Sequence, residues 1–165
     1  MKPSTRAAAA IVVSLAACAD RSTMSTTASA VTARAAGLEL AVSVHGTVLH
    51  VALRNQGEVT LRVAGAVEAA EGRFHDFLRA ELTGVATRTL RFTGDRNAST
   101  TGIVELAPGA ETADDLDLAT WARADINGGA PLAAGDYRIQ VIYAVQQPGI
   151  WNGTISAGPV ALHAP

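Results

Sequence analysis

Cysteine, aromatic side chains and charge are all scarce in this 165-residue chain. It contains one cysteine, Cys18, with 4% aromatic and 17% charged residues and a formal net charge of −2. A lone thiol excludes the disulfide framework of many small secreted domains, so stability must come from a packed core. The missing basic excess argues against a nucleic-acid partner, and the few aromatic residues limit any site that stacks on sugars.

The N-terminus has the layout of an export signal. Lys2 and Arg6 precede an apolar run over residues 7–17, which at about 11 residues is too short for the ~20 that span a bilayer as a helix. A basic start followed by a short apolar run is typical of a cleaved signal peptide. Residues 1–17 are therefore predicted to be a signal peptide.

The segment Leu15-Ala16-Ala17-Cys18 closes that run and resembles the lipobox of bacterial lipoproteins. The resemblance implies cleavage before Cys18 and attachment of a diacylglycerol, usually with a further acyl chain such as palmitate, to this cysteine. Several chains matter because one acyl chain binds a membrane only marginally. The sorting pattern of such lipoproteins implies that Ala19, rather than Asp, at the next position favours the outer membrane, while Asp20 after it leaves the inner membrane open. The alternative is ordinary cleavage after Ala19, which would discard Cys18.

The rest of the chain divides into a tether and one domain. Residues 18–36 are small and polar and are predicted to be a flexible tether, with a first strand through Val31 as the alternative. Residues 37–165 have the length of one domain. Apolar residues there alternate with polar ones in short runs separated by glycine and proline, which predicts an all-β antiparallel sandwich or barrel. A helix over Val67–Ala80 is left open, because this segment is rich in helix formers.

Two resemblances refine the expected fold. Gly135-Asp136-Tyr137 resembles the entry to a late strand in immunoglobulin-like sandwiches, where a tyrosine hydroxyl bonds back to upstream backbone as a tyrosine corner; the alternative is that Tyr137 simply faces the core. A wider resemblance, to the non-catalytic sandwich domain of peptidyl-lysine metalloendopeptidases and to the intracellular proteinase inhibitor family of bacilli, extends over about residues 38–145. It rests on the following segments: Arg54-Asn55-Gln56-Gly57, Phe92-Thr93-Gly94, Leu106-Ala107-Pro108-Gly109-Ala110-Glu111, Asp117-Leu118 and Gly135-Asp136-Tyr137. Such resemblance implies an immunoglobulin-like β-sandwich more than an activity.

No catalytic constellation is visible. The four histidines, His45, His50, His75 and His163, show no His-Glu-x-x-His spacing. His75-Asp76 has no Gly-x-Ser-x-Gly elbow to supply a serine nucleophile. We therefore predict no enzyme, no catalytic residue and no cofactor.

Two clusters have both a functional and a structural interpretation. Asp114, Asp115 and Asp117 lie near Glu111, with Leu116 and Leu118 expected to point inward. Such carboxylates can ligate calcium but more often are solvated, so no metal is predicted. Three aromatic residues, Trp121, Tyr143 and Trp151, can form a ligand platform or, more commonly, pack in the core.

The sequence thus predicts a cell-envelope protein held by lipidated Cys18, facing the periplasm or exterior, with a non-enzymatic binding or scaffolding role. An envelope protein is an expected partner, while the oligomeric state and the binding residues are left open. The alternative function is a proteinase inhibitor that presents residues 94–102 as an exposed loop, with Arg96 as the specificity residue.

Overall fold

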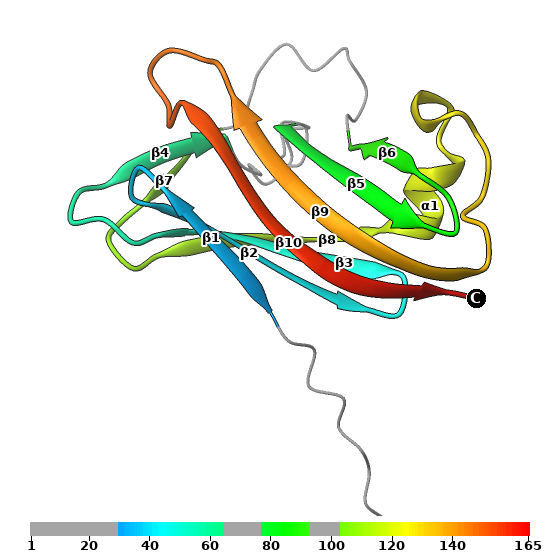
Figure 1. The fold of residues 1–165 in the computed structure, drawn as a ribbon. Coiled ribbons are helices and arrows are strands. Elements are labelled where there is room, and N and C mark those ends of the chain that lie inside the picture. The colour runs from blue at the N-terminus through cyan, green and yellow to red at the C-terminus, as the bar shows by residue number, and fades with distance from the viewer. Residues whose placement is uncertain (1–29, 65–76, 93–102) are drawn as a thin grey trace, which may run out of the picture.

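The computed structural model describes residues 30–64, 77–92 and 103–165, and this part of the chain is built almost entirely of β-strands (Figure 1). The elements are β1 (Val31–Ala35), β2 (Leu38–His45), β3 (Val48–Asn55), β4 (Leu61–Ala64), β5 (Leu78–Gly84), β6 (Arg88–Arg91), β7 (Ile103–Leu106), β8 (Glu111–Asp117), α1 (Leu118–Arg123), η2 (Asp125–Asn127), β9 (Gly135–Val145) and β10 (Gly153–Ala164).

Two four-stranded antiparallel sheets face each other. The first has the order β1-β2-β3-β8 and the second β10-β9-β5-β6, while β4 and β7 pair as a separate ribbon. Alternate residues of each strand point inward, and both sheets contribute to one apolar core. Large members of that core are Leu38, Leu40, Leu49, Leu53, Leu82, Leu90, Phe92, Ile139 and Tyr143. The predicted antiparallel sandwich is confirmed.

Seven strands of the two larger sheets follow the order of an immunoglobulin-like sandwich, whereas β1 and the β4–β7 ribbon lie outside that order. β2-β3-β8 corresponds to strands A-B-E, and β10-β9-β5-β6 to strands G-F-C-C′. Tyr137 lies near the start of β9, the F strand, and its hydroxyl donates a hydrogen bond to the carbonyl of Ala133 at 3.0 Å. This is the predicted tyrosine corner, and it ties the start of β9 to the segment that precedes it.

The predicted tether is wrong at its C-terminal end. Residues 31–35 form β1, which pairs with β2 from Val31↔Val42 to Ala35↔Leu38, so the alternative of a first strand is the one observed. Its inward side chains, Val31, Ala33 and Ala35, are small and only half-buried. Such weak alternation does not stand out against a polar, small-residue background.

Two further expectations need correction. Val59, whose alternation with Leu61 and Val63 in the sequence predicts a strand, lies in the loop before β4 and is 69% exposed. Leu118, whose alternation with Leu116 in the sequence predicts that the strand continues, is buried but begins α1. The helix considered for 67–80 lies partly outside the described residues, and its last three residues, 78–80, belong to β5.

The crossover from β8 to β9 is fixed by polar side chains. Asp117 caps α1 by accepting from the Ala119 N–H at 3.0 Å and the Thr120 hydroxyl at 2.6 Å. The same carboxylate accepts from the hydroxyl of Thr47, in the β2–β3 turn, at 2.9 Å. These bonds, the Thr120 hydroxyl first among them, hold the pKa of Asp117 below its usual value.

Arg88 on β6 holds the later part of this crossover, from Ala122 to Pro131, by hydrogen bonds. Its guanidinium donates to four backbone carbonyls at 2.8–3.1 Å, those of Ala122, Asn127, Ala130 and Pro131. One side chain thus satisfies orphan carbonyls around the ends of α1 and η2.

Candidate functional site

Three described loops gather at one end of the sandwich. They are residues 56–60 after β3, 107–110 before β8 and 146–152 between β9 and β10, and together we call them the loop end (Figure 1). The register places Arg54 opposite Glu111, which brings the first two loops together. The third loop reaches the same end because the Trp151 indole bonds Ala35, near Gly37, whose carbonyl accepts from the Gln56 N–H. In the immunoglobulin-like order, two of the loops belong to the B–C and F–G connections, which carry the binding loops of variable domains.

A buried asparagine holds two of these loops. Asn55 has no exposed surface, yet each of its polar groups has a partner at 2.8–2.9 Å. Its side chain donates to the carbonyls of Val59 and Leu106 and accepts from the Gly57 N–H, and its backbone bonds Gly109 and Ala110. A fully satisfied buried amide rigidifies its surroundings, so the loop end has a fixed base.

The loop between β9 and β10 is tied to β4 and β1. Arg62 donates to the carbonyl of Gly149 at 3.0 Å, and the Trp151 N–H donates to the carbonyl of Arg62 at 2.6 Å. The Trp151 indole N–H donates to the carbonyl of Ala35 at 3.3 Å. The third loop is thereby fixed relative to the other two.

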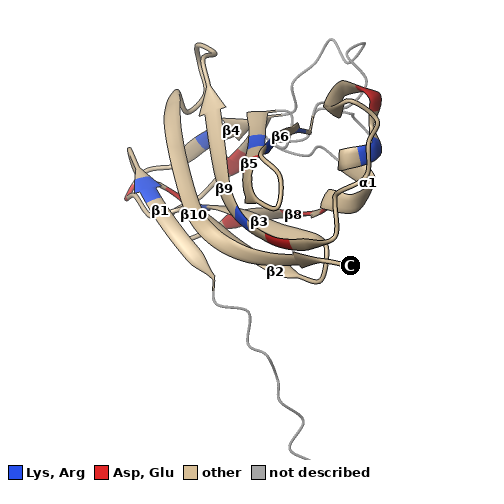
Figure 2. Ribbon diagram, turned by 45° about the vertical axis from the view of Figure 1, so that its right-hand side comes forward, with Lys and Arg blue, Asp and Glu red and all other residues tan. Residues whose placement is uncertain are grey.

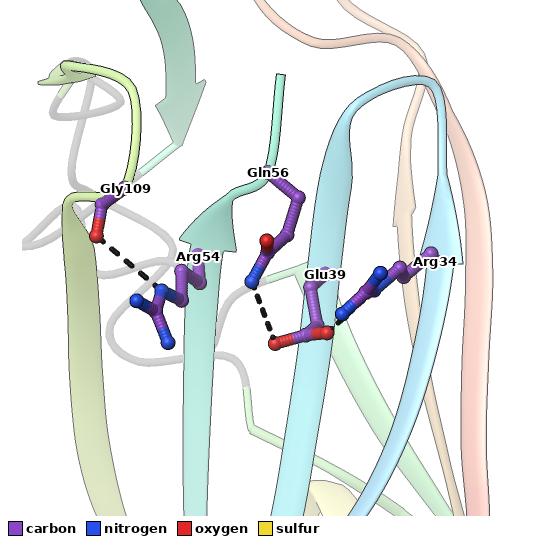
Figure 3. A network of polar contacts seen from close by, with 5 residues as sticks. All are labelled: Arg34, Glu39, Arg54, Gln56 and Gly109. Atoms are coloured by element: carbon purple, nitrogen blue, oxygen red, sulfur yellow. Dashed lines mark hydrogen bonds and ion pairs between the residues drawn. The ribbon is translucent and has the colours of Figure 1, made fainter. Parts of the chain in front are cut away.

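A charged network lies beside the loop end on the outer face of the first sheet (Figure 3). Glu39 accepts from the Arg34 guanidinium at 2.6 Å and from the Gln56 amide at 3.1 Å, while Arg54 donates to the carbonyl of Gly109 at 3.3 Å. The Glu39 side chain is only 9% exposed. The bond from Arg34, above all, holds the pKa of Glu39 below its usual value, against the opposing effect of burial.

The loop end presents a surface of mixed apolar and polar residues. Its three loops contain no histidine, cysteine or serine. They present Val59, 69% exposed, with exposed Glu58, Pro108 and Pro148 nearby in the same loops. An apolar residue on a rigid, mixed surface is suited to binding a protein or peptide.

The structure separates the histidines. His50 Nδ1 lies 2.7 Å from Asp115 Oδ1 on the first sheet, and His163 Nδ1 lies 2.7 Å from Asp136 Oδ1 on the second. His45 ends β2, and His75 lies outside the described residues. Within residues 30–64, 77–92 and 103–165, no group of three His, Cys, Asp or Glu side chains is arranged to hold a metal.

The strand register places Ser43 opposite His50, which lies opposite Asp115. Sequence reasoning missed this order, because the three residues are far apart in the chain. The structure records a hydrogen bond between His50 and Asp115 but none between the described side chains of Ser43 and His50.

The acidic cluster has structural partners. Asp115 pairs with His50, and Asp117 caps α1. Leu116 and Leu118 are buried, as expected. The cap could have been found from the sequence, because Asp is a favoured N-cap residue before a helical run.

The aromatic platform considered from the sequence does not form. Tyr143 and Trp151 stack on each other, with ring centroids 5.5 Å apart at 26°, and both are buried in the core. Trp121 belongs to another part of the core, edge-on to Phe92 at 5.3 Å. Core packing is therefore the correct interpretation for Tyr143 and Trp151.

Two predictions concern residues outside the described part of the chain. These are lipidation at Cys18 and the inhibitory loop over residues 94–102 with Arg96. Among the helices that the structure describes, none has the length and apolar character to cross a membrane. Comparison with models of protein families, with curated proteins and with solved structures gives no match to this chain.

Proposed function

We propose that this chain is a lipid-anchored cell-envelope protein whose sandwich domain has a non-enzymatic binding or scaffolding role. The lipobox-like segment ending in Cys18 supports the anchor. The rigid loop end, held by Asn55, Arg62 and Trp151, supports the binding role. The expected location is the outer membrane, with the domain facing the periplasm or exterior, and the expected partner is another envelope protein.

The direction of β1 is the observation that carries this proposal. The chain enters β1 at Val31, opposite Val42, and runs toward Ala35, beside the loop end. Four steps of a strand span about 13 Å. An anchor upstream of Val31 therefore connects to the domain away from the loop end, which leaves the loops free to meet a partner.

The test compares two exposed valines at opposite ends of the sandwich. Val59 belongs to the loop end and is 69% exposed, whereas Val85 lies in the turn after β5 and is 55% exposed. In the bacterium that produces the protein, a photo-crosslinking amino acid is placed at position 59 or at position 85 of the whole chain. We expect a discrete cross-linked protein from position 59 and none from position 85.

Loss of that product in a Val59 variant that also carries Asn55→Ala would link recognition to the held loops. Equal cross-linking from both positions, or cross-linking from position 85 alone, would contradict a binding role for the loop end. Each variant's urea midpoint shows that the domain remains folded.

A further inference from the structure

Two arginines oppose each other on the outer face of the second sheet. Arg79 on β5 and Arg91 on β6 are direct cross-strand partners, and both are exposed. The basic segments of these two strands are visible in Figure 2. Residues in this relation have Cβ atoms about 4.5–5.5 Å apart, and like charges there destabilise the pair. The arrangement therefore calls for a negative partner.

Carboxylates of the described residues neutralise this pair only in part. Arg79 Nε lies 3.3 Å from Glu81 Oε1, an ion pair with both side chains nearly half exposed. In residues 30–64, 77–92 and 103–165, no carboxylate forms an ion pair with Arg91. The adjoining row of the same face is Thr89, Glu81 and Gln140, so its carboxylate is the Glu81 already paired with Arg79, and its other two side chains are uncharged.

The first sheet shows what a neutralised face of this fold is like. Its corresponding cross-strand row is Arg34, Glu39, Arg54 and Glu111, in which the sign alternates from strand to strand. The row that contains Arg79 and Arg91 continues through Ile142 and Ser156. It therefore has two adjacent positive charges and no carboxylate.

The backbone that carries Arg91 is fixed. The Asn127 side chain accepts from the Arg91 N–H at 2.8 Å and donates to the Arg91 carbonyl at 2.9 Å, as a neighbouring strand would. Asn127 also donates to the carbonyl of Trp121 at 2.8 Å. The edge of β6 is thus paired at Arg91, while the Arg91 side chain stays exposed. The backbone of one of the two arginines is therefore already ordered before a ligand binds, which lowers the entropic cost of binding.

We infer that Arg79 and Arg91 together bind a phosphate group, from a soluble phosphate ester or from a lipid headgroup. Each planar guanidinium presents paired N–H donors that match two oxygens of a phosphate. A phosphate anion between the two guanidiniums offsets their mutual repulsion and accepts hydrogen bonds from both strands. The site does not depend on the lipid anchor or on a partner at the loop end.

Inorganic phosphate is the probe for the shared chemistry. The arginine Nε–Hε resonances of the full-length chain are followed by NMR during titration, with sodium chloride at equal ionic strength as the reference. We expect saturable shifts in the resonances that Arg79→Gln and Arg91→Gln remove. Each of these variants should weaken phosphate binding at least about fivefold, because each removes one charged bidentate donor.

Arg123→Gln is the matched control, because Arg123 is an exposed arginine of α1 for which the structure gives no ion pair with a described residue. It should change phosphate affinity less than about twofold. The Arg91→Gln variant should also have a urea midpoint at low salt that is equal to or above that of wild type, which shows that it folds.

Flotation with phosphatidylglycerol vesicles distinguishes the two sources of phosphate, using the Cys18→Ser chain to remove any acyl anchor. Flotation that requires Arg91 identifies a lipid headgroup, and phosphate binding without flotation identifies a soluble ester. The inference is overturned if phosphate gives no shifts beyond those of chloride. It is also overturned if Arg79→Gln and Arg91→Gln bind phosphate as tightly as Arg123→Gln.

Discussion

The hydroxyl of Tyr137 donates to the carbonyl of Ala133, four residues upstream, at 3.0 Å. This bond joins the start of β9 to the end of the crossover, and the ring is buried. Tyr137→Phe keeps the ring and leaves the Ala133 carbonyl without this donor. We expect a loss of about 0.5–1.5 kcal/mol in the free energy of unfolding, measured by urea denaturation, because Ala133 is exposed and water can reach its carbonyl.

Tyr143→Phe should behave in the opposite way. The Tyr143 hydroxyl is buried, and its geometry gives no hydrogen bond to a described residue. Burial raises the pKa of this phenol, and the nearby backbone of Ala64 opposes that effect only in part. Removing an unsatisfied buried hydroxyl relieves a desolvation cost. We expect unfolding free energy to stay level or to rise by up to about 1 kcal/mol. Equal losses in Tyr137→Phe and Tyr143→Phe would contradict a special role for the corner.

The same two tyrosines illustrate what the sequence could predict. Both lie on the inward stripe of β9, which period-two alternation identifies, and the Gly135-Asp136-Tyr137 entry singles out Tyr137. Nothing local distinguishes the hydroxyl of Tyr143. Its environment is made by Phe77 and Trp151, which come from other segments.

Asn55 and Arg88, which hold the loops and the crossover, could not be predicted either, because their partners also come from distant segments. Asn55 begins Asn55-Gln56-Gly57, a segment whose residues predict a chain break, yet its amide reaches Leu106, 51 positions away. Arg88 finds carbonyl partners 34 to 43 positions away. Such bonds depend on strand register and crossover path, which alternation and turn signals do not specify. The loop end could therefore be foreseen as loops but not as a fixed surface.

Arg88→Met tests the fastening of the crossover. Methionine keeps an unbranched apolar stem but loses every bond to the carbonyls of Ala122, Asn127, Ala130 and Pro131. We expect a loss of roughly 2–4 kcal/mol in the free energy of unfolding, since several acceptors lose a charged donor at once. Amide hydrogen exchange should quicken in residues 118–134 before it does in β2 and β3.

Arg123→Met is the control for Arg88→Met, because it removes the same charge from an exposed position of α1. Its effect should stay within about 0.5 kcal/mol. A similar small effect of Arg88→Met would mean that the crossover is held by packing alone.

Cys18→Ser tests the lipid anchor directly. Serine removes the thiol that would be acylated, so the protein should move from the membrane fraction to the soluble fraction or remain as an uncleaved precursor. Cell fractionation and the mass of the mature N-terminus report the two outcomes. Ala19→Ser, which changes the next residue but keeps the cysteine, should leave the protein in the membrane fraction. A soluble wild-type protein that begins at Asp20 would show that ordinary signal cleavage discards Cys18.

Glu39 makes the stability of the sandwich depend on pH in a defined direction. Its pKa is held below the usual value of 4.5, chiefly by the bond from Arg34. A depressed carboxyl pKa contributes stability that is present above 4.5 and is lost as the pH falls through the folded-state value. Asp117, whose pKa is also lowered from 3.8, contributes in the same direction.

Glu39→Gln should therefore cost about 1–2 kcal/mol at pH 7, because it replaces a charge-assisted bond with a neutral one beside an exposed arginine. The cost should shrink toward zero at pH values where wild-type Glu39 is itself protonated, while the acid sensitivity due to Asp117 remains. Glu58→Gln, on an exposed loop residue, should leave the pH profile of wild type unchanged. Urea midpoints between pH 2.5 and 7 measure all three chains, and parallel profiles for wild type and Glu39→Gln would show that the Arg34–Glu39 pair does not stabilise the fold.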